Sequence, residues 1–308
     1  MKNISVIIPV HNEEKNIVNF IETFYQSIKN IKKKIQFRLV FCDDGSTDNT
    51  WDIIKSVKKK YNRILKINGI KLLENYGKDY AILNGIKYSA SDDAIITIDG
   101  DLQHPINLIP KMVSEWIDNK YSVIHFIREN KNYSKIRIFI SFIFNKFFNF
   151  ITNFKLQPGI TDFKLLDKKI FRKLINTKKQ IFFYRGEISK FNENEKFIES
   201  KINKRTSGES SFSIKSLLVL SLNYITIYSY SPLYFISIFG TLLFIIGIVL
   251  LFMMIFGFFP LGLLQITLIF NSILFGITII FIGILSFYLR NIFLNIVQTQ
   301  ENRIDEKI

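Results

Sequence analysis

The stretch AIITIDGDLQHP (Ala94–Pro105) joins an apolar run to two aspartates one residue apart. Its first five residues have the apolar, β-branched character of a buried strand. Asp99 and Asp101 follow directly, with Gly100 between them, and Pro105 opens a helical pattern. Carboxylates at the end of a buried strand need a positive partner, because burial without one is costly. The pattern therefore indicates a site that receives a cation or a positively charged group.

Strand and helix signals alternate on both sides of this stretch, over residues 1 to about 130. The predicted strands are short apolar runs at 4–10, 37–42, 64–68 and 94–99. The predicted helices between them cover 17–28, 51–57, 78–89 and 106–117. This order favours an α/β fold with a mostly parallel sheet, in which ligands bind beyond the carboxyl ends of the strands. The side chains expected to converge at those ends are Asn12, Asp43, Asp44, Asp99 and Asp101.

The triplet DGD is suited to a hard divalent cation. Mg²⁺ or Mn²⁺ is commonly held by one or two carboxylates together with substrate phosphates. Such an ion would neutralise a diphosphate leaving group as its bond breaks. A D-x-D triplet alone is a weak signal, and its place after an apolar strand gives it weight. The interpretation requires that Asp99 and Asp101 share an open space and are not tied up by lysines.

The segment FCDDGSTDNT (41–50) carries a second pair of acids, Asp43 and Asp44, after another strand. One interpretation is structural: Gly45 permits a turn from strand to helix, and Ser46, Thr47 or Asp48 can cap the helix that follows. Capping needs only one acid of the pair, however. The functional alternative is that Asp44 accepts hydrogen bonds from a base or ribose, as an acid beyond a strand does in dinucleotide-binding folds.

A long uncharged region dominates the second half of the chain. From Ser216 to Leu289 there is no Asp, Glu, Lys or Arg. A bilayer span needs about 20 apolar residues, so two spans fit within residues 232–290. We expect a soluble domain at 1–212, a juxtamembrane amphipathic helix at 213–231 and a tail at 291–308. Basic residues flank the hairpin on both sides, which predicts that both ends are cytoplasmic, and no signal peptide is expected.

The chain of 308 residues has a net charge of +15 and one cysteine, Cys42. The charge is compatible with nucleic acid, an anionic membrane or a phosphorylated substrate. A nucleic-acid binder would not need the apolar hairpin, so we expect no nucleic-acid partner. The helical pattern at 135–152 has large apolar residues beside a polar stripe. It fits a helix in the membrane interface, or one buried between the domain and the hairpin.

Six motifs occur in order along the chain, and together they are specific. They are SVIIPVHNEE (5–14), VFCDDGSTDNT (40–50), NYGKDYAILNGI (75–86), DGDLQHP (99–105), TDFKLLDKK (161–169) and KRTSGESSFSIKSL (204–217). The chain thereby resembles the family 2 glycosyltransferases, in the polyprenyl-phosphate branch that includes dolichol-phosphate mannose synthases and bacterial two-span members. The resemblance implies a GT-A fold, a nucleotide-sugar donor, a divalent metal and inversion at the anomeric carbon.

The resemblance also implies roles for individual residues. Those expected to line the nucleoside site are Pro9, Asn12, Glu13 and Asp44. Asp99 and Asp101 would hold Mg²⁺ or Mn²⁺ and the diphosphate, with Gln103 beside them. Asp162 matches the acid near the acceptor, and Arg205, with the loop at 207–212, matches the segment that closes over the phosphates. Lys78 matches a family lysine, although it could equally be a solvated residue in the first turn of a helix.

The expected reaction transfers a sugar from a UDP- or GDP-sugar to undecaprenyl phosphate or a similar lipid phosphate. Such a phosphate is largely a dianion at neutral pH, with a second pKa near ~6. We therefore expect Asp162 to orient the acceptor or its partners rather than remove a proton. The alternatives are a processive polysaccharide synthase, which would need a Q-x-x-R-W segment and more spans, and a catalytically silent membrane scaffold. The resemblance further implies a homo-oligomer, possibly a tetramer.

Overall fold

The computed structural model describes residues 1–31, 34–61, 64–129, 135–152, 154–176, 182–191, 194–201, 224–225, 228–229, 231–258, 262–297 and 304–308. Contacts divide the chain into two compact units. The first contains Met1–Asn149, Phe154–Ser213 and Gln300–Ile308, and the second contains Phe150–Asn153 and Ile214–Thr299. The predicted juxtamembrane helix at 213–231, Arg205 and the loop at 207–212 fall largely or wholly outside the described residues.

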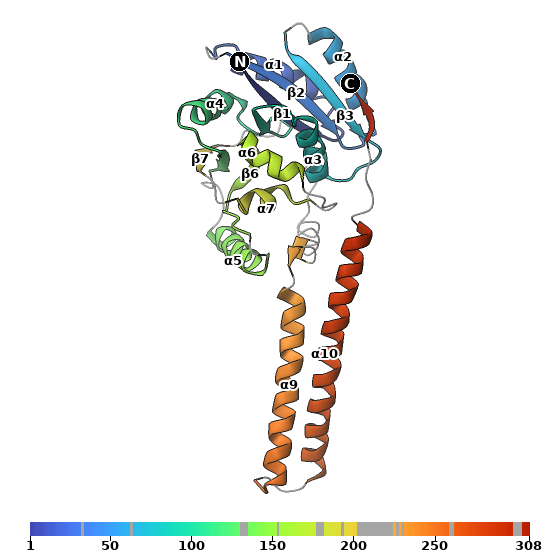
Figure 1. The fold of residues 1–308 in the computed structure, drawn as a ribbon. Coiled ribbons are helices and arrows are strands. Elements are labelled where there is room, and N and C mark those ends of the chain that lie inside the picture. The colour runs from blue at the N-terminus through green and yellow to red at the C-terminus, as the bar shows by residue number, and fades with distance from the viewer. Residues whose placement is uncertain are drawn as a thin grey trace. The chain divides into compact units, whose positions relative to one another are not determined.

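The first unit is built on one mixed sheet (Figure 1), whose described strands run in the order β7-β5-β6-β4-β1-β2-β3-β8. The strands are β1 (Lys2–Val10), β2 (Ile35–Asp43), β3 (Lys66–Leu72), β4 (Ala94–Thr97), β5 (Val123–Arg128), β6 (Ile160–Asp167), β7 (Glu195–Ser200) and β8 (Ile304–Lys307). Strands β1, β2, β3 and β4 are parallel to one another, as predicted.

Helices cover both faces of this sheet. They are α1 (Ile17–Ile28), α2 (Thr50–Tyr61), α3 (Lys78–Tyr88), the short 3₁₀ helix η1 (Ile106–Leu108), α4 (Ile109–Asp118), α6 (Lys168–Ile175) and α7 (Tyr184–Ser189), whereas α5 (Lys135–Thr152) is a further helix between β5 and β6 in the chain. Side chains alternate along a strand, so Val6 and Ile8 of β1 pack with α1, α2 and α4, whereas Ile7 packs with α3, α6 and α7. The buried core thus has two layers, one on each face.

Strand β6 departs from the parallel pattern. It lies between β4 and β5 and is antiparallel to both, with Thr97 opposite Lys164. The first residues of β6 therefore lie beside the carboxyl end of β4. This direction brings the motif TDF (161–163) beside the strand end that carries the DGD triplet.

The end of the described chain returns to the first unit. Strand β8 pairs antiparallel with the outer edge of β3, and Gly69 and Ile308 exchange two backbone hydrogen bonds of 2.9 Å each. The indole N–H of Trp51, which is 5% exposed, donates to Glu306 Oε2 at 2.6 Å. The predicted tail at 291–308 therefore includes a strand of this sheet.

The second unit contains two long apolar helices, α9 (Ser231–Ile255) and α10 (Leu263–Val297). Their segments Leu233–Ile255 and Leu263–Ile292 have mean hydropathies of 2.9 and 2.5 and are long enough to cross a membrane. A Cβ added to Gly276 would lie 2.6 Å from the backbone nitrogen of Phe244, so glycine permits this close approach. Tyr234, near the start of α9, contacts Phe287, near the end of α10. The helices are therefore antiparallel and could form a transmembrane hairpin.

The contact between β8 and α2 gives a first prediction. Replacing Glu306 by Ala leaves the buried Trp51 indole N–H without its acceptor, which we expect to cost ~1 kcal/mol. For a unit of this size, that loss lowers the unfolding midpoint by about 2–4 °C, measurable by scanning fluorimetry in detergent. Asp305→Ala is the control, since Asp305 lies 3.8 Å from Lys71 at the surface. In a Trp51→Phe background, Glu306→Ala should have little further effect, and a full additional loss would contradict this contact.

Candidate active site

The predicted nucleoside residues lie together at the ends of β1 and β2. Asp44 is 4% exposed, and its Oδ1 accepts a hydrogen bond of 2.8 Å from the backbone N–H of Tyr76. Burial raises the pKa of Asp44. Pro9 is buried at the end of β1, where it pairs with Cys42. In this structure Asp44 thus holds the loop that precedes α3.

Asn12 and Glu13 shape the turn beside Asp44. Asn12 adopts a left-handed backbone with φ of 55°, and its Oδ1 accepts a hydrogen bond of 2.8 Å from the backbone N–H of Thr47. The backbone N–H of Glu13 donates to Thr50 Oγ1 at 2.8 Å. The structure therefore gives both residues a scaffolding role, and their contact with a nucleoside stays a prediction.

Asp43 and Asp44, at the end of β2, have different contacts in the structure. Asp43 Oδ1 accepts the backbone N–H of Ser46 at 3.0 Å within the turn that leads to α2. Asp44 is not needed for this turn. Asp43 thus stabilises the turn, Asp48 caps α2 by accepting the backbone N–H of Thr50 at 3.0 Å, and Asp44 joins two loops at the end of the sheet.

The DGD triplet lies after β4 in a tightly built loop. A Cβ on Gly100 would lie 2.8 Å from Val10 Cγ1, so only glycine fits there without a shift. Leu102 has a φ of 63°, a strained conformation for a side chain of this kind. Gln103 donates to both oxygens of Asp101, from its backbone N–H at 3.1 Å and from Nε2 at 2.7 Å. The loop thereby fixes the Asp101 carboxylate, as expected for a ligand-binding acid.

Asp99 has cationic and aromatic neighbours. Its Oδ1 lies 2.6 Å from Lys78 Nζ, and its Oδ2 lies 3.3 Å from His104 Nε2. His104 is itself buried against the rings of Phe126 and Phe163. Although burial opposes ionisation, Lys78 and His104 lower the pKa of Asp99. The requirement that lysines leave the acid pair open is therefore met only in part.

Asp162 joins this cluster from the start of β6. Its carboxylate accepts a bidentate pair from Arg185 in α7, with Nε at 2.6 Å from Oδ1 and Nη2 at 2.9 Å from Oδ2. Lys78 Nζ also lies 2.6 Å from Asp162 Oδ2, so this lysine bridges Asp162 and Asp99. Burial opposes ionisation of Asp162, but Arg185 and Lys78 outweigh it and hold its pKa well below the usual range. Asp162 is consequently a carboxylate that holds cations.

Two residues of this site, Arg185 and Lys164, were not predicted from the sequence. Arg185 lies in a separate segment, YRGEIS, and only the fold brings it to Asp162. Lys164 is 1% exposed, and its Nζ donates to the Thr161 carbonyl at 2.5 Å. Burial lowers the pKa of Lys164 to about 7. A lysine inside the motif TDFKLL was a usable signal, because its neighbours Phe163 and Leu165 are large and apolar.

The residues present match a divalent ion in donor chemistry. Mg²⁺ and Mn²⁺ sites often use one or two carboxylates and fill the remaining positions with phosphate oxygens and water. Asp99 and Asp101 are such a pair, and no larger group of His, Cys, Asp or Glu is placed to hold a metal within the described part of the chain. The pair therefore fits an ion completed by substrate phosphates, provided that Lys78 yields its place at Asp99.

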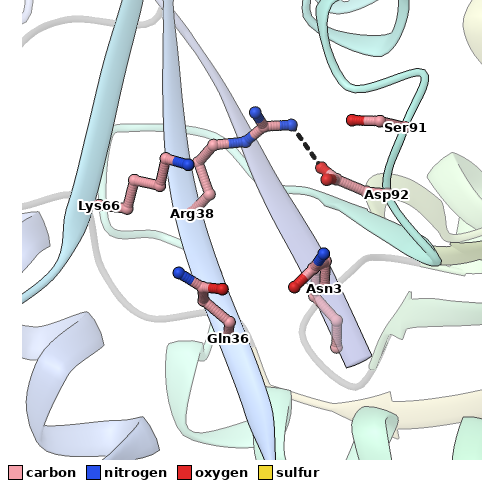
Figure 2. A pocket seen from close by; sticks show the side chains of 7 residues that line it. Asn3, Gln36, Arg38, Lys66, Ser91 and Asp92 are labelled. Carbon is pink, nitrogen blue, oxygen red and sulfur yellow. Dashed lines mark hydrogen bonds and ion pairs between the residues drawn. The ribbon is translucent and has the colours of Figure 1, made fainter. Parts of the chain in front are cut away.

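A separate polar pocket lies at the amino ends of the parallel strands, opposite to the acid cluster (Figure 2). It is lined by residues at the amino ends of β1, β2 and β3 and before β4, namely Asn3, Ile4, Gln36, Arg38, Lys66, Ser91 and Asp92. Arg38 Nη2 pairs with Asp92 Oδ2 at 2.6 Å across it. Ligands of such sheets bind at the carboxyl ends of the strands, so this pocket is not the predicted donor site.

Comparison with known proteins identifies the family. The model of glycosyl transferase family 2 matches residues 5–175, which is more than half of the chain. The chain belongs to this family. The segment matched includes the acids at the ends of β2 and β4 and the start of β6, so the predicted family is confirmed and the protein is a glycosyltransferase.

Individual relatives agree with this assignment. The uncharacterized glycosyltransferase YkcC of Bacillus subtilis is 30% identical over 242 residues, covering 78% of this chain and 72% of that protein. The prophage bactoprenol glucosyl transferase homolog of Escherichia coli is 28% identical over 232 residues, covering 75% and 73%.

A solved structure shows the fold of this glycosyltransferase. The mannosyltransferase PcManGT from Pyrobaculum calidifontis, in complex with GDP-Man and Mn²⁺, superposes with a TM-score of 0.50 at 13% identity. The match covers 74% of this chain and 63% of that one, so this chain spans less than two thirds of that protein. The predicted GT-A fold is confirmed, and at this identity the likeness shows the fold alone.

Asp162→Asn tests whether this acid orients its neighbours or removes a proton. The carboxamide keeps the shape but cannot neutralise Arg185 and Lys78, so sugar transfer should fall about 10- to 100-fold and remain measurable. The pH profile of the rate should move little, because the pKa of Asp162 lies well below the assay range. Asp52→Asn, at an exposed acid of α2, is the control. Complete loss of turnover would contradict the orienting role.

Lys164 gives a pH prediction. Its pKa is about 7 in the folded protein and ~10.4 in an unfolded chain. Between these values the unfolded state binds more protons, so stability due to Lys164 rises with pH, by at most about 1.4 kcal/mol per pH unit. In Lys164→Met this rise between pH 7 and pH 9 should disappear from the unfolding free energy. Lys59→Met, at an exposed position of α2, should keep it. An unchanged slope in Lys164→Met would refute the assignment.

Proposed function

We propose that this glycosyltransferase transfers a sugar from a UDP- or GDP-sugar to a polyprenyl phosphate, with inversion at the anomeric carbon. Undecaprenyl phosphate or a closely similar lipid phosphate is the proposed acceptor. The observation that carries the proposal is the combination, in one chain, of a cation-rich acid cluster and two apolar helices. Relatives named bactoprenol glucosyl transferases align over 75% of this chain and support the same acceptor class.

The acceptor chemistry agrees with the geometry at Asp162. A phosphate monoester is mostly dianionic at neutral pH, since its second pKa is near ~6. Such a nucleophile needs positive charge around it more than it needs a general base. Arg185, whose side chain is 42% exposed, and Lys78, at 35%, provide this charge. We propose that Asp162 orients Arg185 toward the lipid phosphate, while Lys78 supplies positive charge between the acceptor and the donor diphosphate.

The donor would lie over the ends of β1, β2 and β4. In this proposal Pro9, Asn12, Glu13 and Asp44 border the nucleoside, while Asp99 and Asp101 face the diphosphate, with Gln103 fixing Asp101. Mg²⁺ or Mn²⁺ bound between the acids and the diphosphate would neutralise charge on the leaving group. Arg205 is proposed to close over the phosphates.

The proposed location is a membrane, with the transferase domain on its cytoplasmic side. The two apolar helices would form a hairpin, and basic residues at both of its ends favour the cytoplasm. Helix α5 exposes Phe142 and Phe147, which are 54% and 57% accessible, and this supports its placement in the membrane interface. A homo-oligomer, implied by resemblance alone, stays a prediction.

The decisive assay presents the purified full chain in detergent with undecaprenyl phosphate, Mn²⁺ and a panel of UDP- and GDP-sugars, and detects the glycolipid by mass. One donor should give a product with a phosphate-linked sugar. Asp101→Ala should abolish this product at every pH, because the acid acts as a ligand and not as a titrating base. Asp52→Ala is the matched control. Product formation by Asp101→Ala, or the absence of product from every donor with folded wild-type protein, would refute the proposal.

A further inference from the structure

Lys78 occupies an unusual position for a lysine. It is the first residue of α3, directly after Gly77, whose φ is 93°. The amino end of a helix carries partial positive charge and favours acids over lysines. The side chain is held there by Asp99 and Asp162, each 2.6 Å from its Nζ. The position of Lys78 is therefore explained by its ion pairs with Asp99 and Asp162, because the helix dipole at this end disfavours a lysine.

The ammonium group and a divalent ion cannot share Asp99 easily. Both are cations, and repulsion between charges a few ångströms apart is strong in a partly buried site. Asp99 is 25% exposed, and its Oδ1 is the atom that contacts Lys78. An ion bound at this oxygen would face the lysine at close range. One of the two cations must then move.

We propose that the Lys78 ammonium competes with the divalent metal for Asp99. It occupies the cation position at Asp99 until a nucleoside diphosphate binds together with the metal. The ammonium neutralises Asp99 and Asp162 in the free protein. When the diphosphate binds, its negative charge gives Lys78 a new partner and lets the metal take Asp99. Metal binding and nucleotide binding are consequently cooperative. This inference rests on the proposed metal role of Asp99 and Asp101.

A structural link connects Lys78 to the proposed nucleoside site. The backbone N–H of Tyr76 donates to Asp44 Oδ1, two residues before Lys78. A ligand that competes for the Asp44 carboxylate therefore acts on the loop that carries Lys78. Release of this loop would free the ammonium to follow the phosphates.

The test measures Mn²⁺ binding to the full chain by electron paramagnetic resonance, without substrate and then with UDP or GDP. Wild type should bind Mn²⁺ weakly alone and at least tenfold more tightly with one nucleotide. Lys78→Met should bind Mn²⁺ alone at least threefold more tightly than wild type, and the added effect of nucleotide should shrink. Lys78→Gln, which keeps a polar side chain without the charge, should behave likewise and covers a failure of Lys78→Met to fold.

Two controls separate occupancy of Asp99 from a general change of charge. Lys66→Met removes a lysine at the opposite edge of the sheet and should change Mn²⁺ affinity less than threefold. Arg185→Gln removes a cation that contacts Asp162 and should also have the smaller effect. An effect of Arg185→Gln as large as that of Lys78→Met would overturn the inference, as would unchanged or weaker binding in both Lys78 variants.

Asp99→Asn separates this inference from the proposed function. If Asp99→Asn abolishes Mn²⁺ binding while the Lys78 variants bind as wild type does, the competition fails and the metal site stands. If Asp99→Asn leaves Mn²⁺ binding unchanged, both the competition and the metal role of Asp99 fail. Tight Mn²⁺ binding in the Lys78 variants, combined with no glycolipid product from the wild type, would support the competition and refute the proposed reaction.

Discussion

A carboxylate buried as deeply as that of Asp162 stays ionised only when cations or hydrogen-bond donors surround it. Arg185 supplies two parallel hydrogen bonds and Lys78 a third. The same ammonium group of Lys78 also contacts Asp99, so it joins the carboxyl end of β4 to the amino end of β6. Through Lys78 and Arg185, these ion pairs hold helices α3 and α7 to the start of β6, and the geometry of the site depends on them.

The same charge balance limits the chemistry. An acid with a pKa well below its usual range is a weak proton acceptor, so Asp162 is poorly suited to general base catalysis. A lipid phosphate that is already ionised does not need a base, whereas a sugar hydroxyl does. Preorganised positive charge is the means by which such a site lowers the barrier between two anionic reactants. The cations around Asp162 suit a phosphate nucleophile better than a neutral one.

The chain path adds a second constraint. After the two apolar helices, the chain returns to the first unit and adds β8 to the exposed edge of β3. An unpaired edge strand is open to association with other chains, and β8 covers it. The contacts of Trp51 and Gly69 with this strand show that the edge is shaped to receive it. The last described residues thus belong to the transferase sheet.

The sequence by itself determined the alternation of strands and helices, the two apolar helices and the placement of Asp44, Asp99 and Asp101 at strand ends. These features follow from local periodicity and hydropathy, which are properties of neighbouring residues. Only the tertiary structure decided the direction of β6, the pairing of β8 and the partners of Asp162. Arg185 follows Asp162 by more than twenty residues, and no local pattern links them. Lys78 contacts both Asp99 and Asp162 because β6 is antiparallel to β4, which places the first residues of β6 beside the carboxyl end of β4. The direction of a strand is set by packing across the whole sheet.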